Sequence, residues 1–249
     1  KYLKKIEKLN PSGVIYTFAP TFPESLQNVA KKIPVVLIGE KDVVSGIDTV
    51  ELNSEKMGRM LAEYLLELGH RKVGFISTPL TERQSARRAR IKGFCDTFAA
   101  AGCSDGVYVR SLPKEMDIMF QEIDMEYRTG YELTLELIQQ VPQITAIAGT
   151  NDMVALGIRD ALLKEKYRIP EDISVIGCDN LLFSGLRGID LTTVEHYVSK
   201  KGEDACEILI QEMGEQKTKN SSSGENMIHH IEYEPRLVVR GSSSYPKIK

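Results

Sequence analysis

Three polar residues stand at positions that could recognise a small ligand. Arg90, Asn151 and Asp179 each come shortly after an apolar strand pattern. A guanidinium can fork onto vicinal hydroxyls or a carboxylate, and a carboxylate can accept hydrogen bonds from two hydroxyls. These residue types together offer donors and acceptors to a polar molecule. Each also has a purely structural explanation, since Arg90 could be a solvated helix arginine, Asn151 a helix cap and Asp179 a turn residue.

Motifs for catalysis and metal binding are missing from the sequence. It contains no G-x-S-x-G, G-x-x-x-x-G-K-[ST], G-x-G-x-x-G or H-E-x-x-H pattern. The four histidines show no metal-ligand spacing, and the four scattered cysteines form no C-x-x-C pair, so reduced thiols are expected. We therefore predict no cofactor, no metal and no catalytic residue, and an enzyme is the weaker hypothesis.

Alternating strand and helix patterns must position the polar residues. Nearly continuous apolar runs predict parallel strands at residues 13–18, 34–38, 72–76, 144–148 and 173–177, with a last strand near 233–239. Helical patterns lie between them, about 54–68, 84–101, 129–140, 152–164 and 198–213. This order predicts an α/β fold with doubly wound parallel sheets, in which ligands bind at the carboxyl ends of the strands.

Composition narrows the class of protein further. The chain has 249 residues, 42% hydrophobic and 27% charged, and a net charge of −3. No window approaches ~18 uninterrupted apolar residues, and the charged N-terminus lacks the apolar core of a signal peptide. The chain as given is therefore expected to be cytoplasmic, with no membrane contact. Without a basic excess, these residues are not expected to touch nucleic acid directly.

Five segments are more specific than composition. They are YLLELGHRKVGFI from residue 64, RARIKGF from 88, AIAGTNDMVALG from 146, IPEDISVIGCDN from 169 and LTTVE from 191. Taken in this order, they closely resemble the effector-binding core of LacI/GalR-family transcriptional repressors. The terminal EPRLVVRGSS looks like the family's last strand.

The resemblance implies a periplasmic-binding-protein-like (type I) fold of two Rossmann-like subdomains with a small effector in the cleft between them. Residues 1–53 and 195–230 would form the incomplete N-terminal subdomain, and residues 54–194 and 231–249 the C-terminal subdomain. The family's DNA-binding headpiece and its first strand-helix unit have no counterpart in this chain. Operator DNA would be a partner only through such a headpiece.

The resemblance also implies roles for individual residues. The family places an arginine three residues before Gly-Phe on the effector, which selects Arg90, and it places the Asn151 amide on a sugar hydroxyl. A carbohydrate or sugar phosphate is favoured over a purine, because Met125 and Val198 stand where relatives often carry aromatic residues. The expected effector-binding residues are Arg90, Asn151, Asp179, Met125, His196, Phe18 and Thr17. Arg90 and Asp179 are expected at the carboxyl ends of neighbouring strands, in a wet cleft, on the same ligand. The alternative is a structural salt bridge between them.

A homodimer is expected through the helix at 152–164 and the apolar loop at 181–189. Exposed apolar clusters usually mark contacts, and relatives dimerise through the matching segments. The residues concerned are Leu156, Asp160, Leu182, Phe183 and Leu186.

The sequence thus predicts the ligand-sensing and dimerisation core of a LacI/GalR-type regulator that controls DNA binding allosterically. The alternative is the solute-binding protein of a sugar transporter, which would be a monomer with an upstream export signal. An α/β enzyme would instead need a nucleophile or base in the cleft and measurable turnover.

We predict that this chain alone has no sequence-specific affinity for DNA, because phosphate neutralisation dominates such binding and the net charge is −3. A gel-shift titration with duplex DNA at low salt should show no discrete complex. A tight, salt-sensitive complex would contradict the prediction that operator DNA is bound by a headpiece and not by this core.

Overall fold

The computed structural model describes residues 6, 9–17, 23–39, 44–81, 85–115, 124–218 and 228–247. It divides into two compact units. Unit 1 comprises Lys1–Asn53 and Tyr197–Glu234, and unit 2 comprises Ser54–His196 and Pro235–Lys249. Each unit is therefore built from two separate stretches of chain. In the described part of the chain, no helix combines the length and hydropathy needed to cross a bilayer.

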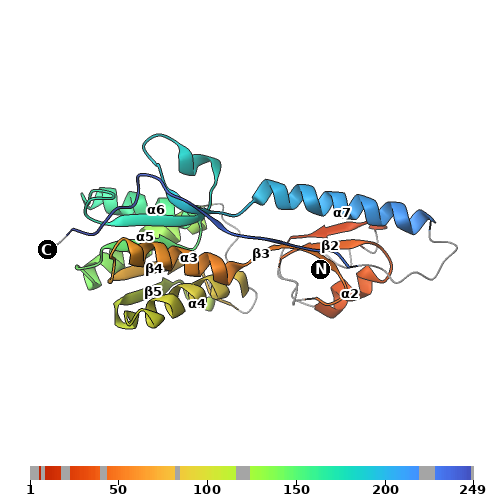
Figure 1. Ribbon diagram of the computed structural model, residues 1–249, viewed down its shortest axis with the longest axis horizontal. Helices are drawn as coiled ribbons and strands as arrows, with labels where there is room; N and C mark the ends of the chain where they lie inside the picture. Colours follow the sequence, from red (N-terminus) through yellow and green to blue (C-terminus); the bar gives the residue numbers. More distant parts are fainter. Residues whose placement is uncertain are drawn as a thin grey trace. The chain divides into compact units, whose positions relative to one another are not determined.

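Unit 1 contains a four-stranded parallel sheet in the order β1-β2-β3-β9. Helix α7 packs on β1, β2 and β3 and lies along this sheet in Figure 1. The elements are β1 (Val14–Tyr16), α2 (Pro23–Ala30), β2 (Val35–Ile38), β3 (Asp48–Leu52), α7 (Val198–Thr218) and β9 (His230–Tyr233).

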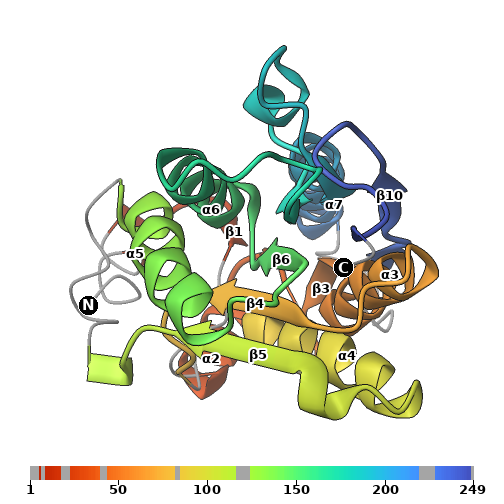
Figure 2. The same cartoon turned by 90° about the vertical axis from the view of Figure 1, so that its left-hand side faces the viewer.

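Unit 2 is a doubly wound sheet in the order β10-β8-β7-β6-β4-β5, parallel except for the antiparallel β10. Helices α3 and α4 pack together and so do α5 and α6, and the two pairs lie on either side of the sheet in Figure 2. The elements are α3 (Ser54–Glu67), β4 (Val73–Ser77), α4 (Ser85–Ala100), η2 (Ser104–Gly106), β5 (Val107–Ser111), α5 (Met125–Gln140), β6 (Ala146–Gly149), α6 (Asp152–Lys164), β7 (Ser174–Asp179), η4 (Leu182–Gly185), β8 (Thr192–Glu195) and β10 (Arg236–Val238).

The predicted α/β class with parallel sheets is confirmed, and the last strand, β10, lies inside the predicted range 233–239 but is shorter. Residues 233–239 do not form one strand, because β9 pairs with β3 in unit 1 whereas β10 pairs with β8 in unit 2. Pro235 stands between them and has no N–H for a strand ladder. Residues 231–234 therefore belong to unit 1 and residues 195–196 to unit 2, which shifts the predicted boundaries by a few residues.

The order of strands in unit 2 creates a point where the chain reverses direction across the sheet. From β4 the chain moves outward to β5 and then returns to β6 on the other side of β4. In open α/β sheets, ligands bind outside the carboxyl ends of the strands at such a switch point. The carboxyl ends of β4 and β6 are therefore where the fold favours a binding site.

Glycines bring the helices of each pair into backbone contact. A Cβ atom on Gly58 of α3 would overlap the carbonyl oxygen of Arg90 on α4, and one on Gly93 would overlap the carbonyl oxygen of Glu55. Beneath this contact, Phe75 of β4 packs edge-on against Phe94 of α4, with ring centroids 5.0 Å apart. Helix α4 is thus held close to α3 and over β4.

We predict that Gly58→Ala lowers the free energy of unfolding of unit 2 by about 1–3 kcal/mol, the usual effect of overpacking. The added methyl group meets backbone atoms, which cannot move aside as a flexible side chain could. Urea denaturation followed by circular dichroism measures the change.

Gly202→Ala in α7 is the matched control. No atom lies within 4 Å of a Cβ at this position, so the substitution should stabilise the protein by about 0.5–1 kcal/mol through helix propensity. Equal effects of the two substitutions would contradict the role assigned to the α3–α4 contact.

Candidate functional site

Arg90 is buried at the centre of the predicted site. It lies on α4 and is only 5% exposed, so it is not the solvated helix arginine that spacing alone allowed, nor does it stand in a wet cleft. Its Nη1 donates to the carbonyl oxygen of Thr150, and its Nη2 lies 3.6 Å from the sulfur of Met57. Its Nε is buried without a hydrogen-bond partner. The guanidinium therefore retains an unused donor.

Three buried hydroxyls at the ends of β4 and β6 also have no hydrogen-bond partner. They are Ser77 Oγ at the last residue of β4, Thr78 Oγ1 immediately after it, and Thr150 Oγ1 immediately after β6. Leaving a buried polar group unpaired costs about 1–3 kcal/mol. Such a group in a folded protein calls for an explanation, and a bound ligand or water is one.

These hydroxyls were not singled out from the sequence as site residues. Their positions directly after strand patterns were the available signal, but serine and threonine are common there as turn and cap residues. Burial without a partner distinguishes them, and burial depends on the tertiary fold. Together with Arg90 Nε they mark the switch point as the candidate polar site.

Asn151 acts as the N-cap of α6. Its side-chain oxygen accepts a hydrogen bond from the backbone nitrogen of Val154 at 2.9 Å. The capping role considered from the sequence is therefore present, and it holds the side chain beside Thr150 at the carboxyl end of β6. Its predicted contact with an effector remains a prediction.

Asp152, the first residue of α6, joins three parts of unit 2 by hydrogen bonds. Its Oδ1 accepts from Thr193 Oγ1 of β8 at 2.6 Å. Its Oδ2 accepts from the backbone nitrogen of Leu181 at 2.9 Å and from Ser184 Oγ at 2.5 Å. Burial raises the pKa of this carboxyl, and the three hydrogen bonds oppose that shift. Asp152 was not among the residues predicted for the effector site.

Asp179 ends β7 with a φ of 118°, a backbone conformation that non-glycine residues rarely adopt. Its Oδ1 lies 3.8 Å from Nδ1 of His196, and the two side chains are 20% and 27% exposed. Two predicted effector residues therefore meet at the partly open ends of β7 and β8. Strain at a single residue is characteristic of functional sites.

The expectation that Arg90 and Asp179 stand on neighbouring strands is wrong. Arg90 follows β4 and Asp179 ends β7, and β6 lies between these strands in the sheet. The pair is thus bridged by the β6 end, where Thr150 and Asn151 lie.

Cys178 lies next to Asp179 in the buried part of β7. Burial raises the pKa of its thiol to about 12, although the nearby Arg90 opposes the shift. Since the thiolate is the reactive form of cysteine, this thiol is not activated as a nucleophile. The prediction that the thiols are mostly buried holds for Cys178 alone, because Cys95 and Cys103 are half-buried and Cys206 is exposed.

The remaining predicted effector residues are less informative. Met125 is 7% exposed at the start of α5, and Thr17 is exposed just after β1 of unit 1. Phe18 lies outside the described residues. The structure therefore brings together Arg90 with the β6 end and Asp179 with His196, and it gives Met125 the burial of a core residue.

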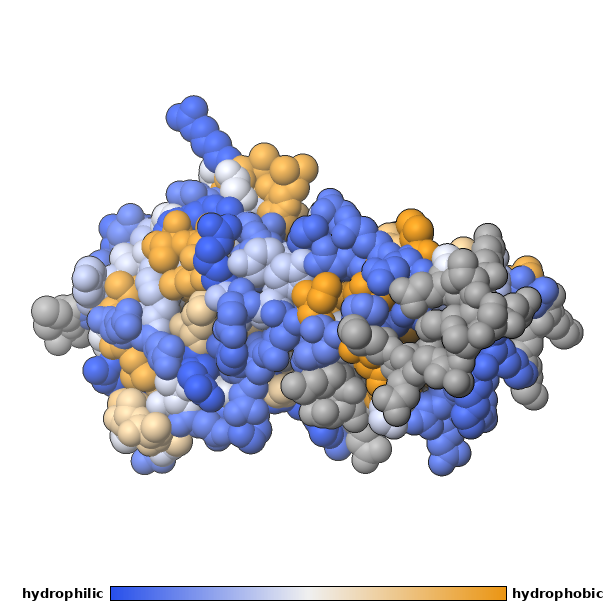
Figure 3. All heavy atoms as spheres, turned by 45° about the vertical axis from the view of Figure 1, so that its right-hand side comes forward, coloured by the Kyte–Doolittle hydropathy of each residue, from blue (hydrophilic) through white to orange (hydrophobic). Residues whose placement is uncertain are grey.

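The apolar loop after Asp179 is exposed. The Leu182 side chain is 91% exposed and Leu186 is 52% exposed, whereas Phe183 is half-buried. Hydrophobic atoms gather on this loop where it projects at the top of Figure 3. On α6, Leu156 is half-buried, and Asp160 accepts from Tyr127 Oη at 3.0 Å and pairs with Arg159.

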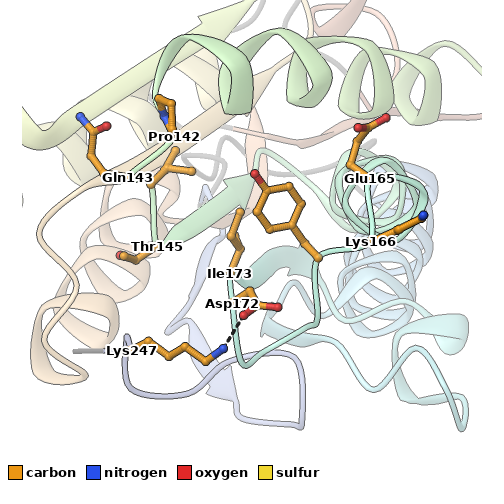
Figure 4. Close-up of a pocket in the computed structure, with 10 residues that line it drawn as sticks. Pro142, Gln143, Thr145, Glu165, Lys166, Asp172, Ile173 and Lys247 are labelled. Carbon is orange, nitrogen blue, oxygen red and sulfur yellow. Dashed lines mark hydrogen bonds and ion pairs between the residues drawn. The ribbon is translucent and has the colours of Figure 1, made fainter. Parts of the chain in front are cut away.

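A separate pocket of about 490 Å³ lies at the amino ends of β6 and β7, the opposite edge from the predicted site. Figure 4 shows Lys247 pointing toward Asp172, and their Nζ and Oδ1 atoms are 2.5 Å apart. Asp172 also binds Arg168. Among the described residues that line this pocket, none has a buried side-chain polar atom without a partner, in contrast to the switch point.

Comparison with known proteins shows the family of this chain. Residues 62–243 match the model of the periplasmic binding protein-like domain. The chain is 27% identical over 244 residues to the HTH-type transcriptional repressor PurR of Mannheimia succiniciproducens, covering 97% of the chain and 67% of the relative. PurR of Pasteurella multocida is 28% identical over 243 residues, with the same coverage. The chain thus spans about two thirds of these relatives.

Solved structures share the fold. A LacI transcriptional regulator from a Rhodococcus species aligns with a TM-score of 0.79 and 18% identity, covering 98% of this chain and 82% of that one. A LacI family regulator from Enterococcus faecium, solved with bound ribose, aligns with a TM-score of 0.80 and 21% identity, covering 99% and 84%. The chain therefore belongs to the family of periplasmic binding protein-like domains, in the form predicted from its sequence, the effector-binding core of the LacI/GalR type.

Proposed function

We propose that this chain is the sensing core of a LacI/GalR-type transcriptional regulator and that it binds a small carbohydrate at the carboxyl ends of β4, β6 and β7. The observation that carries the proposal is the group of buried, unpartnered polar atoms around Arg90. Arg90 Nε can only donate, and each hydroxyl can donate or accept. A polyhydroxylated ligand offers an acceptor to Arg90 Nε, and both donors and acceptors to the protein hydroxyls.

The partly exposed Asp179 supplies the acceptor side of the proposed site. Its carboxylate can accept from two sugar hydroxyls, and the neighbouring His196 can donate or accept according to its protonation. The site is thus rich in donors near β4 and in acceptors near β7, as recognition of a ring with several hydroxyls requires. Ribose in a structural neighbour is consistent with this ligand class.

Binding would act on DNA through population shift. A ligand changes an equilibrium between two conformations only by its difference in affinity for them. We infer that the ligand favours one arrangement of the dimer and that an attached headpiece converts this arrangement into a change in operator affinity. In this role the protein is a cytoplasmic sensor and not an enzyme. A transporter's solute-binding protein would bind ligand without any effect on DNA.

Thr150→Val tests the site with little disturbance of the fold. The substitution removes a buried hydroxyl that has no partner, so the free protein should be as stable as the wild type or slightly more stable. Affinity for the ligand should fall about twofold to tenfold, the value of one neutral hydrogen bond of about 0.5–1.5 kcal/mol. Calorimetric melting and titration with ribose, other pentoses, hexoses, their phosphates and purine bases measure both quantities.

Thr134→Val is the matched control for this substitution. The Thr134 hydroxyl is equally buried but donates to the carbonyl oxygen of Gly130 at 2.6 Å. Its loss should lower stability by about 0.5–1.5 kcal/mol and leave ligand affinity unchanged. If Thr150→Val instead lowered stability and changed no affinity in the panel, the proposed site would be wrong.

Arg90→Ala should lower both the stability of the protein and its affinity for the ligand, because the guanidinium is buried and bonded to Thr150. We expect stability to fall by about 1.5–3 kcal/mol, the value of a hydrogen bond to a charged group. Ligand affinity should fall about tenfold to a hundredfold. Asp179→Asn, at a partly exposed carboxylate, should show the affinity loss with little change in melting temperature.

We also propose that the exposed loop around η4 forms a homodimer contact. Leu182→Asp should convert the dimer to a monomer with a change in stability within about 0.5 kcal/mol, because the side chain is 91% exposed. Sedimentation equilibrium measures the association. Ile210→Asp, at a 68% exposed position of α7, is the control that should remain dimeric. A wild-type monomer at high micromolar concentration would refute the contact.

A further inference from the structure

Unit 1 contains a compact group of metal-ligating side chains that lies outside the proposed effector site. Asp48 Oδ1, Glu212 Oε1 and His229 Nδ1 all lie within 4.8 Å of one another. His229 Nδ1 is 3.3 Å from the Asp48 oxygen and 4.0 Å from the Glu212 oxygen. The three residues come from β3, from α7 and from the residue before β9. Sequence spacing gave no sign of this group, because distant parts of the chain contribute to it.

The group is held in place by the backbone on two sides. The His229 backbone nitrogen donates to Asp48 Oδ1 at 2.6 Å, and its carbonyl oxygen accepts from the Thr49 backbone nitrogen at 2.9 Å. Helix α7 packs on β3 and carries Glu212 to the same place. The Asp48 and Glu212 side chains are each 11% exposed. Ligands fixed this way need little ordering to bind an ion.

The decisive observation is the state of His229 Nδ1. The atom is buried and makes no hydrogen bond, even though Asp48 Oδ1 is 3.3 Å away. The two atoms are therefore close without the alignment of a hydrogen bond. Two ligand atoms on one tetrahedral zinc ion, each about 2.0–2.2 Å from it, are separated by about 3.4 Å. The observed 3.3 Å matches that separation.

We propose that Asp48, Glu212 and His229 bind a divalent transition-metal ion of the Zn²⁺ type. One imidazole nitrogen and two carboxylate oxygens are a donor set suited to zinc, with water completing the tetrahedron. The 4.0 Å separation between Nδ1 and the Glu212 oxygen requires the glutamate side chain to close by about half an ångström. Such an ion would tie α7 to the edge of the sheet.

A second group on the other side of the β3–β9 pair is less suited to a metal. It consists of Glu51, His230 and Glu232, and the last two are exposed. His230 faces the two carboxylates with Nε2, at 3.3 Å and 4.0 Å, while its Nδ1 is engaged with Thr49 Oγ1 at 2.6 Å. Exposure, and not spacing, therefore separates this group from the first. No atom of this second group is both buried and unpartnered in the way that His229 Nδ1 is. It therefore supplies an internal control.

The test is calorimetric titration of metal-free protein with ZnCl₂. Cys206→Ser serves as the background, because the Cys206 thiol is exposed and could bind zinc itself. We expect one saturable site, with no comparable heat from Mg²⁺ or Ca²⁺, which prefer all-oxygen cages. His229→Gln should weaken zinc binding by at least about tenfold, since even outer-sphere partners of a metal are worth that much. His230→Ala should bind zinc like the background.

If circular dichroism shows that His229→Gln alters the fold, Glu212→Gln provides a second test of the site. It replaces a ligand on the helix and should also weaken binding by at least about tenfold. Cobalt(II) provides a spectroscopic check, because its visible absorption reports tetrahedral coordination and should be lost in both ligand variants. Absence of saturable zinc binding in the background protein would overturn the proposal. So would loss of binding in His230→Ala with retention in His229→Gln.

Discussion

The burial of the Arg90 guanidinium is the constraint on which unit 2 depends. An isolated ionised group is expensive to remove from water unless hydrogen bonds compensate it. Here the Thr150 carbonyl oxygen accepts one of those bonds, and the contact through Gly58 fixes the backbone of α4 at Arg90 itself. The arrangement is incomplete, because Nε has no partner. In the proposed function, ligand atoms that complete it would gain this hydrogen bond as binding energy.

The fold supplies this arrangement through its strand order. The chain runs outward from β4 to β5 and then returns to β6 on the other side of β4. The carboxyl ends of β4 and β6 therefore lie side by side at the switch point. Ser77 and Thr78 come from one strand end and Thr150 from the other. A single βα unit would place such a polar residue at one strand end only. The reversal brings residues of two different strand ends to one edge.

The sequence predicted the parts of this site that depend on local residue patterns. Strands such as 144–148 and the helix at 152–164 were recognisable because they are apolar and periodic, and Arg90 was selected by resemblance. Strands β3 and β5 were missed, because Asp48, Glu51 and Arg110 interrupt the apolar runs that mark buried strands.

Tertiary properties could not be predicted in the same way. No local pattern tells a buried arginine from a solvated one, and none tells a partnered threonine such as Thr134 from an unpartnered one such as Thr150. The same holds for His229, whose carboxylate neighbours lie 181 and 17 positions away in sequence. In each case the deciding quantity is burial, which depends on elements that are distant along the chain.

Asp152 shows why individual residues of this unit must be chosen with care as probes. Its carboxylate holds Leu181 and Ser184 of the exposed loop, and Thr193 of β8, while its backbone begins α6 beside Thr150. Replacing it would leave three donors unpaired at once, and the loop and the ligand edge would move together. Energies of residues in one hydrogen-bond network are not additive. Thr150 and Leu182 have no such shared bonds through their side chains, so substituting them can separate ligand binding from association.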